Sequence, residues 1–266
     1  MLIYSVIYTT IISCKGNLRQ IINNWLKNSH LSKLKAFSAI ILRENCFLCA
    51  AKQTINHGLC EACLKDLPWL PANSCAQCGL SSSGQVCGNC LSAPPHFDAT
   101  HAVFLYHYPM DAMIQRYKYS NTLSLSHTLG QLLSEKISLI NSTENIDLII
   151  PMPMHPTRLK QRGFNQALEI AKIVDKVLNK NIKTKLDYKS VNRQTLTPPQ
   201  ASLPLKERVK NIKGAFKVNA NFSGKRIAIV DDVMTTGASL NELAKTLKQA
   251  GATHVECWVI ARTLTH

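Results

Sequence analysis

The chain has 266 residues, of which 45% are hydrophobic and 18% charged, the composition of an ordinary soluble protein with room for two domains. No apolar run reaches the length of a transmembrane helix, so we expect no membrane span. The net charge of +15 is concentrated in residues 151–226, where seventeen lysines and arginines outnumber four acids. This concentration predicts either a solvated basic face or a surface for phosphate-rich ligands, such as nucleotides or nucleic acid.

The N-terminal segment, residues 1–45, begins with the apolar run MLIYSVIYTTIIS. The run lacks the basic start and the small-residue cleavage site of a signal peptide, so we expect a cytoplasmic protein. A translation start assigned upstream of the true start would also explain this run. Between residues 17 and 44 apolar residues recur at helical spacing, which predicts a helix. Such a helix either packs on the rest of the fold or binds a membrane surface or nucleic acid.

Eight of the ten cysteines form four CxxC pairs within residues 46–93. Two thiolates separated by two residues can turn back on one ion, and two such pairs complete the tetrahedral site that suits Zn²⁺. We therefore expect a double zinc ribbon with two structural zinc ions, while a single occupied site would also fit. Sequential pairing is the default, and the spacing leaves other pairings open. The expected ligands are Cys46, Cys49, Cys60, Cys63, Cys75, Cys78, Cys87 and Cys90.

Other uses of these cysteines fit the pattern less well. A disulfide framework needs an oxidising compartment, and nothing in the sequence points to export. A redox CxxC would not occur four times in one short segment. Cys257 lies in the strand-like run VECWVIA and is expected in the core, whereas Cys14 lies in the N-terminal segment.

Residues 97–266 alternate between strand-like and helical patterns, which predicts an α/β domain with a mostly parallel sheet and flanking helices. Strands are predicted over residues 99–106, 147–152, 226–231 and 255–261, with a short one near Thr184. Helices are predicted over residues 111–119, 123–139, 165–178 and 240–250. Residues 190–205 are polar, contain prolines and have no periodicity, so we expect a long loop of the kind that often closes over a site.

The segment RIAIVDDVMTTGASL, residues 226–240, joins a buried strand to two acids and a loop of small and hydroxyl residues. Ligands of open parallel sheets bind beyond the carboxyl ends of the strands, where Asp231 and Asp232 are expected. Residues 235–239 precede a helix, and backbone N–H groups there can hold an anion, with Gly237 allowing close approach. Carboxylates accept hydrogen bonds from vicinal hydroxyls and hold Mg²⁺ through its waters. The pattern therefore predicts a site for a sugar 5-phosphate, and the plainer alternative is a buried strand with an acidic helix cap.

This segment resembles the phosphoribosyl pyrophosphate (PRPP) binding motif of type I phosphoribosyltransferases, in which apolar residues precede two acids, TTG and a small residue. The resemblance implies that Asp231 and Asp232 contact the ribose hydroxyls and that Mg²⁺ accompanies PRPP. It also implies that the 5-phosphate is held by Thr235, Thr236, Gly237, Ala238 and Ser239.

A larger part of the chain resembles the ComF family, which comprises competence-associated, phosphoribosyltransferase-like proteins with an N-terminal double zinc ribbon. The resemblance rests on the cysteine pairs, the PRPP motif, IDLIIPMPMHPTRLKQRGFNQA (residues 146–167) and RQTLTPPQASLPLKERVKNIKGAF (residues 193–216). It implies a loop facing pyrophosphate, formed by Pro151, Met152, Pro153 and Met154 and followed by Arg158, Arg162, Gly163, Asn165 and Gln166. It also implies a flexible loop with its exit helix, which would include Arg193, Gln200, Arg208 and Asn211.

As an enzyme, such a protein would displace pyrophosphate from C1 of PRPP. The resemblance implies that the catalytic groups are Asp231, Asp232, Arg158 and Arg162. Purine-salvage relatives place a catalytic acid where this chain has Thr235, which argues against hypoxanthine or guanine as the acceptor.

Three functional interpretations stay open. The first is a phosphoribosyltransferase with an unidentified acceptor, and the second is a non-catalytic adaptor that binds single-stranded DNA during DNA uptake in natural transformation. The third is a regulatory scaffold with a degenerate site. The expected partners are PRPP, single-stranded DNA and a competence helicase-type protein.

Overall fold

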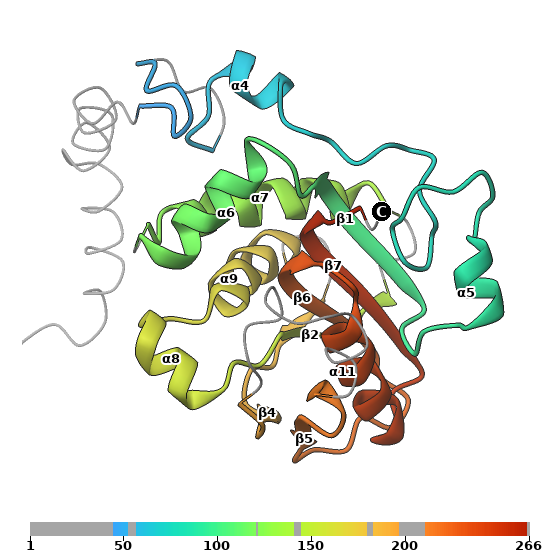
Figure 1. Cartoon of the computed structure of the whole chain (residues 1–266). Helices are drawn as coiled ribbons and strands as arrows, with labels where there is room; N and C mark the ends of the chain where they lie inside the picture. The colour runs from blue at the N-terminus through green and yellow to red at the C-terminus, as the bar shows by residue number, and fades with distance from the viewer. Residues whose placement is uncertain are drawn as a thin grey trace, which may run out of the picture.

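The structure is a computed structural model that describes residues 45–52, 57–120, 122–140, 145–179, 183–196 and 211–264. Its centre is a five-stranded sheet in the order β1-β7-β6-β2-β3 (Figure 1), and every pairing in it is parallel. The strands are β1 (Ala99–Leu105), β2 (Leu148–Pro151), β3 (Lys185–Leu186), β6 (Arg226–Met234) and β7 (His254–Arg262). The predicted α/β class with a parallel sheet is therefore confirmed.

Both faces of the sheet are covered, which explains why its strands read as continuous apolar runs. Along β6, Ala228 and Val230 pack into one core cluster, whereas Ile227 and Ile229 pack into another. The first cluster includes residues of α6 (Met110–Tyr119), α7 (Leu125–Ser138) and α9 (Gln166–Leu178), and the second includes residues of α11 (Ala238–Gln249) (Figure 1). Successive side chains of the strand thus face opposite sides, as its period of two requires.

Local signals account for α9 and for its contact with α7. The side chain of Asn165 accepts hydrogen bonds from the amides of Ala167 (3.0 Å) and Leu168 (3.4 Å) and so caps the start of α9. Buried residues of α9 then recur every three or four positions. At Gly130 of α7, an added Cβ would lie 2.6 Å from Cβ of Ile173. A larger residue there would push the two helices apart.

Two elements differ from the sequence-based expectation. β6 continues to Met234 instead of ending at residue 231, because it stays paired with β7 as far as Arg262. Residues 190–205 are not a loop throughout, since β4 (Val191–Arg193) pairs antiparallel with β5 (Phe216–Val218). Residues 197–210 lie outside the described ranges, and so does the N-terminal segment up to residue 44 with its expected helix and Cys14.

A short helix that the sequence analysis did not predict, α8 (Pro156–Arg162), follows β2. His155 Nδ1 accepts a hydrogen bond from the amide of Thr157 (3.2 Å), and Pro156 occupies the first turn, where proline is well tolerated. Gly163 ends the helix in the left-handed conformation with φ of 79°. None of the helices in the described ranges combines the length and the apolar character that crossing a bilayer requires.

The cysteine-rich segment lies along the β1 side of the sheet (Figure 1) and contains two short helices, α4 (Glu61–Lys65) and α5 (Gly88–Ser92). The amide of Leu70 donates a hydrogen bond to the carbonyl oxygen of Val103 in β1 (2.9 Å). Next to it, the Trp69 ring packs on Phe104 with ring centroids 4.7 Å apart. The segment is therefore attached directly to the edge of the sheet.

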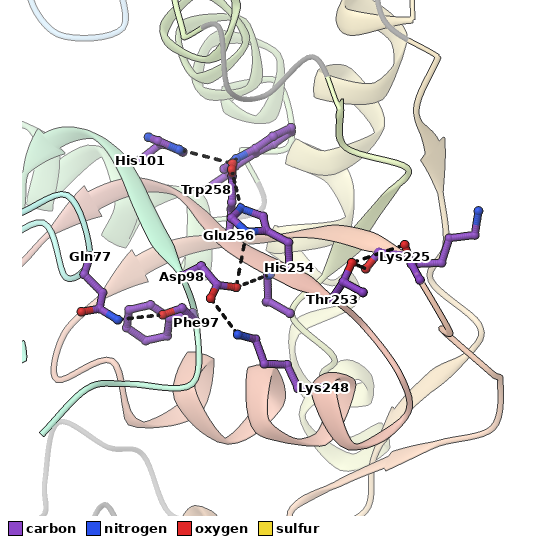
Figure 2. A network of polar contacts seen from close by, with 12 residues as sticks. Gln77, Phe97, Asp98, His101, Lys225, Lys248, Thr253, His254, Glu256 and Trp258 are labelled. Atoms are coloured by element: carbon purple, nitrogen blue, oxygen red, sulfur yellow. Dashed lines mark hydrogen bonds and ion pairs between the residues drawn. The ribbon is translucent and has the colours of Figure 1, made fainter.

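A buried polar network lies toward the amino ends of β1 and β7 (Figure 2). Glu256 is 1% exposed; its carboxylate accepts a hydrogen bond from Trp258 Nε1 (3.0 Å) and lies 2.9 Å from His254 Nε2 and 3.3 Å from His101 Nε2. Burial opposes the ionisation of Glu256, but these three contacts outweigh it and lower the pKa of Glu256 to about 2. Asp98 extends the network, with its Oδ2 3.6 Å from His254 Nδ1.

We expect Glu256→Gln to lower the free energy of unfolding by about 3 kcal/mol at pH 7, since one pKa unit corresponds to about 1.4 kcal/mol. The pKa of Glu256 is lower in the folded than in the unfolded chain, so its stabilisation is present above a pH of about 4.5 and is lost as the pH falls toward 2. Urea denaturation of the unaltered protein and of Glu256→Gln from pH 7 to pH 3 measures the difference in their free energies of unfolding. Any loss of metal in acid affects the two proteins alike. A difference that stays constant over this range would contradict the prediction.

Candidate functional site

The eight paired cysteines form two groups in sequence order, which confirms sequential pairing. The first cysteine group is Cys46, Cys49, Cys60 and Cys63, and the second cysteine group is Cys75, Cys78, Cys87 and Cys90. Within each group the Sγ atoms lie within 4.8 Å of one another, and one Sγ pair in each is 3.6 Å apart. A zinc–sulfur tetrahedron with bonds of about 2.3 Å has edges of about 3.8 Å, so the geometry fits Zn²⁺.

Backbone amides favour the thiolate form of one cysteine in each group, whereas burial and the neighbouring thiols raise the pKa of Cys63 and of Cys90. The amide of Cys63 points at Cys60 Sγ (3.5 Å), and the amides of Cys78 and Cys87 point at Cys75 Sγ (3.5 and 3.3 Å). Burial opposes the ionisation of Cys46 and Cys75, but backbone hydrogen bonds outweigh it and lower the pKa of each to about 6. Four thiolates per ion leave no open coordination position, so both sites fit structural rather than catalytic zinc.

A cavity of about 570 Å³ lies beyond the carboxyl ends of β2 and β6. It brings together residues that the sequence analysis assigned to one site from three separate segments, residues 146–167, 193–216 and 226–240. These are Met152, Pro153, Met154, Arg158, Arg162, Asn165, Gln166, Arg193, Asp231, Asp232, Thr235 and Ser239. Pro151, Thr236, Gly237 and Ala238 are next to these residues in the chain and do not line the cavity. Gln200 and Arg208 lie outside the described residues.

The two adjacent acids have different surroundings. Asp232 is 7% exposed and is paired with Lys118 of α6, whose Nζ lies 3.1 Å from Asp232 Oδ1. Burial would lower the pKa of Lys118, but the charge of Asp232 outweighs it and raises that pKa, so the ammonium stays charged. Burial, and then the charge of Asp232, raise the pKa of Asp231 to about 7. The surroundings of Asp231 therefore favour its protonated form more than water does, and a cation in the cavity would favour its ionised form.

Residues 235–239, called the 235–239 loop here, comprise the three residues that connect β6 to α11 and the first two residues of α11. Gly237 is the N-cap of α11 and has φ of 77°, a left-handed conformation that favours glycine. An added Cβ would lie 2.8 Å from Met234 Cε, but that atom ends a flexible side chain, so it is the positive φ that makes a side chain unfavourable here. Thr235 and Ser239 line the cavity at the start of α11, where the positive end of the helix dipole suits an anion.

Three arginines from α8 and β4 line the same cavity: Arg158, Arg162 and Arg193. Burial, and then the charge of Arg162, lower the pKa of Arg158, while burial and the charge of Arg158 lower the pKa of Arg193. Arg162 is held by Gln166, whose Oε1 accepts a hydrogen bond from Nη1 (3.3 Å), and it stacks on the Tyr119 ring at 5.3 Å. These like charges repel one another, so a polyanion would be favoured here.

Comparison with known proteins matches two family models to this chain, a double zinc ribbon domain over residues 37–91 and a phosphoribosyl transferase domain over residues 160–265. Competence protein F of Haemophilus influenzae is 34% identical over 218 residues, which cover 77% of this chain and 91% of that protein. The chain belongs to the ComF family. Two further ComF-type relatives are the DNA utilization protein YhgH of Escherichia coli K12 (31% identical; 82% of this chain and 97% of that protein covered) and Competence protein ComFC of Streptococcus pneumoniae (24%; 85% and 93%).

The parallel sheet of this ComF-family protein is thus of the phosphoribosyltransferase type, and the double zinc ribbon precedes it in the chain. Its cavity also contains polar residues that the sequence analysis did not single out. These are Tyr106, Gln115, Lys118, Tyr119 and Gln161. Four of the five lie on α6 or just before it. The helical pattern of this segment identified its apolar face, but it could not show that its polar face lines the cavity.

Proposed function

We propose that this ComF-family protein binds PRPP together with Mg²⁺ in the cavity. The observation that supports this most is that the acid pair of β6, the 235–239 loop and the arginines of α8 and β4 surround one cavity of about 570 Å³. Each part suits one part of the ligand. Carboxylates suit ribose hydroxyls and hydrated Mg²⁺, amides at a helix start suit the 5-phosphate, and arginines suit pyrophosphate.

The chain's own groups would then divide the work as follows. Asp231 and Asp232 would hold the ribose hydroxyls and the waters of Mg²⁺, which would offset the negative charge of pyrophosphate. Arg158 and Arg162 would bind the pyrophosphate and stabilise it as it leaves C1. Thr235 would offer neither an acid nor a base to a purine ring nitrogen, so salvage of hypoxanthine or guanine is not what this site favours. Isothermal titration with PRPP, with and without Mg²⁺, tests the proposal, and no binding in the presence of Mg²⁺ would contradict it.

We further propose that the protein handles single-stranded DNA during DNA uptake, with a helicase-type protein as a partner. The names of its relatives, Competence protein F and DNA utilization protein YhgH, support this role. The basic segment supports it as well, because all nine of its described lysines are exposed. The exposed lysines are Lys160, Lys172, Lys176, Lys183, Lys185, Lys189, Lys213, Lys217 and Lys225. Lysines of this kind contact the DNA backbone and read no sequence.

We therefore expect binding to single-stranded oligonucleotides with little sequence preference and with an affinity that falls as salt is added. On a log–log plot the slope should be about −0.7 per phosphate contacted. Charge reversal at Lys160 and Lys189 should make this slope shallower, whereas the same change at Lys52 and Lys65 serves as a matched control outside the basic segment. Fluorescence anisotropy measures both effects. Binding that is absent at about 50 mM salt, or insensitive to salt, would rule out this role for the segment.

A further inference from the structure

A single buried arginine connects the second cysteine group to the cavity. Arg262, the last residue of β7, is 2% exposed. Its Nε donates a hydrogen bond to the carbonyl oxygen of Cys78 (2.8 Å), and its Nη1 donates to the carbonyl oxygens of Met234 (3.0 Å) and Thr235. Cys78 belongs to the second cysteine group, and Thr235 begins the 235–239 loop. The guanidinium therefore joins the cysteine group to the loop through backbone atoms alone.

The second cysteine group is also fixed to the sheet near this arginine. The hydroxyl of Thr100 in β1 donates a hydrogen bond to the carbonyl oxygen of Gln77 (2.6 Å). The side-chain amide of Gln77 in turn donates to the carbonyl oxygen of Phe97 (3.3 Å; Figure 2). An added Cβ at Gly79 would lie 3.7 Å from Cγ and Cδ of Arg262, so the turn that follows Cys75 and Cys78 packs on the aliphatic part of the Arg262 side chain. The geometry of this turn thus fixes the position of Arg262.

The first cysteine group has different neighbours. Arg116 of α6 donates a hydrogen bond to the carbonyl oxygen of Phe47 (3.2 Å), and His57 pairs with Glu135 of α7 (2.8 Å). These contacts attach the first group to α6 and α7 rather than to the 235–239 loop. The two groups therefore have the same chemistry and different places in the fold, which makes one a control for the other.

We propose that the second cysteine group, with zinc bound, positions the 235–239 loop through Arg262 and thereby sets the affinity of the cavity for sugar 5-phosphates. The inference rests on the proposed function, because it assigns the loop to the 5-phosphate. Arg262 holds the carbonyl oxygens of Met234 and Thr235, and these fix the direction of the amides that follow. Without zinc, the Cys78 carbonyl loses its fixed place, and Arg262 loses the contact that anchors it to the ribbon.

The test compares two variants that each remove one thiolate, Cys87→Ser in the second group and Cys49→Ser in the first. Each should lose one zinc ion, as measured by elemental analysis. Cys87→Ser should weaken the binding of ribose 5-phosphate about ten-fold, a typical size for coupling between sites. Its affinity for pyrophosphate with Mg²⁺ should not change, because the arginines of α8 and β4 hold that ligand. Cys49→Ser should weaken the binding of ribose 5-phosphate much less, because the first group contacts α6 and α7 and not the 235–239 loop.

Two results would overturn the proposal: unchanged ribose 5-phosphate affinity in Cys87→Ser that has lost its zinc, or an equal loss in Cys49→Ser. Arg262→Lys adds a variant that keeps both zinc ions, and it decides the question if Cys87→Ser does not fold. Lysine has one donor nitrogen and cannot span the Cys78 and Met234 carbonyls. Arg262→Lys should therefore also lose affinity for ribose 5-phosphate and not for pyrophosphate, and unchanged ribose 5-phosphate affinity would overturn the proposal.

If the unaltered chain binds neither ligand, the proposed function fails, and amide hydrogen exchange at residues 235–239 still tests the coupling. Faster exchange in Cys87→Ser than in Cys49→Ser supports it, and equal rates contradict it.

Discussion

Replacing Asp231 and Asp232 together with asparagine is expected to weaken PRPP binding by at least about 100-fold, as measured by isothermal titration with Mg²⁺. A hydrogen bond to a charged group contributes about 1.5–3 kcal/mol, so the loss of two such bonds amounts to two orders of magnitude or more. Asparagine also removes the negative charge that holds hydrated Mg²⁺. Burial and the charge of Asp232 raise the pKa of Asp231 to about 7, which shows that the two carboxylates repel each other. The asparagine side chains are neutral, so the variant loses this repulsion.

The same substitutions leave Lys118 without its carboxylate partner, which lies 3.1 Å away in the unaltered chain. Melting temperature and zinc content are therefore measured on the same sample. Glu61→Gln with Asp66→Asn is the matched control, because it removes the same charge from two exposed positions outside the cavity and should keep PRPP affinity. PRPP affinity that is unchanged in a folded Asp231→Asn, Asp232→Asn variant would show that the acids of β6 are not part of the site.

Removal of zinc is expected to have the larger effect on stability. We expect two zinc ions per chain, and metal binding at each group should stabilise the fold of residues 45–92 by on the order of 10 kcal/mol. Without the metal, each group holds four sulfur atoms within 4.8 Å of one another, and thiolates at that distance repel. A strong chelator should therefore lower the melting temperature sharply and expose the apolar residues that this segment buries.

Elemental analysis and thermal unfolding with and without chelator test this expectation. Cys257→Ala is a suitable control, since Cys257 is fully buried in β7, belongs to neither cysteine group and should leave the zinc content at two per chain. Protein without metal whose eight paired cysteines are oxidised, or a melting temperature that does not respond to chelation, would contradict the assignment.

Features that depend on neighbours in the sequence were predictable. The CxxC spacing identified both cysteine groups and their default pairing, because each ligand pair closes within a few residues. The apolar run before Asp231 identified β6, because a strand covered on both faces has no polar side. The start and end signals of α8, Pro156 and Gly163, were also present, but seven residues rich in positive charge give no apolar period to mark a helix.

Features that depend on strand order were not predictable from the sequence. Lys118 meets Asp232 because α6 follows β1 and reaches the carboxyl edge of β6, and no local pattern shows this. The role of Arg262 is hidden for the same reason. Its partner Cys78 is separated from it by 184 residues, and an arginine at the end of an apolar strand reads as an ordinary surface residue. Such contacts appear only when the order of the sheet is known.

The position of β7 has a consequence for the newly made chain. β1 joins the sheet through β7, which lies between β1 and β6 and is the last strand along the described chain. All eight paired cysteines leave the ribosome well before β7 does, so the ribbon can take up zinc while the strand that connects it to β6 is still being made. Because protein segments fold as they emerge, the ribbon would bind its metal before the C-terminal strand enters the sheet. A nascent chain arrested before residue 254 should therefore be a zinc protein in which Arg262 is not yet present to brace the 235–239 loop.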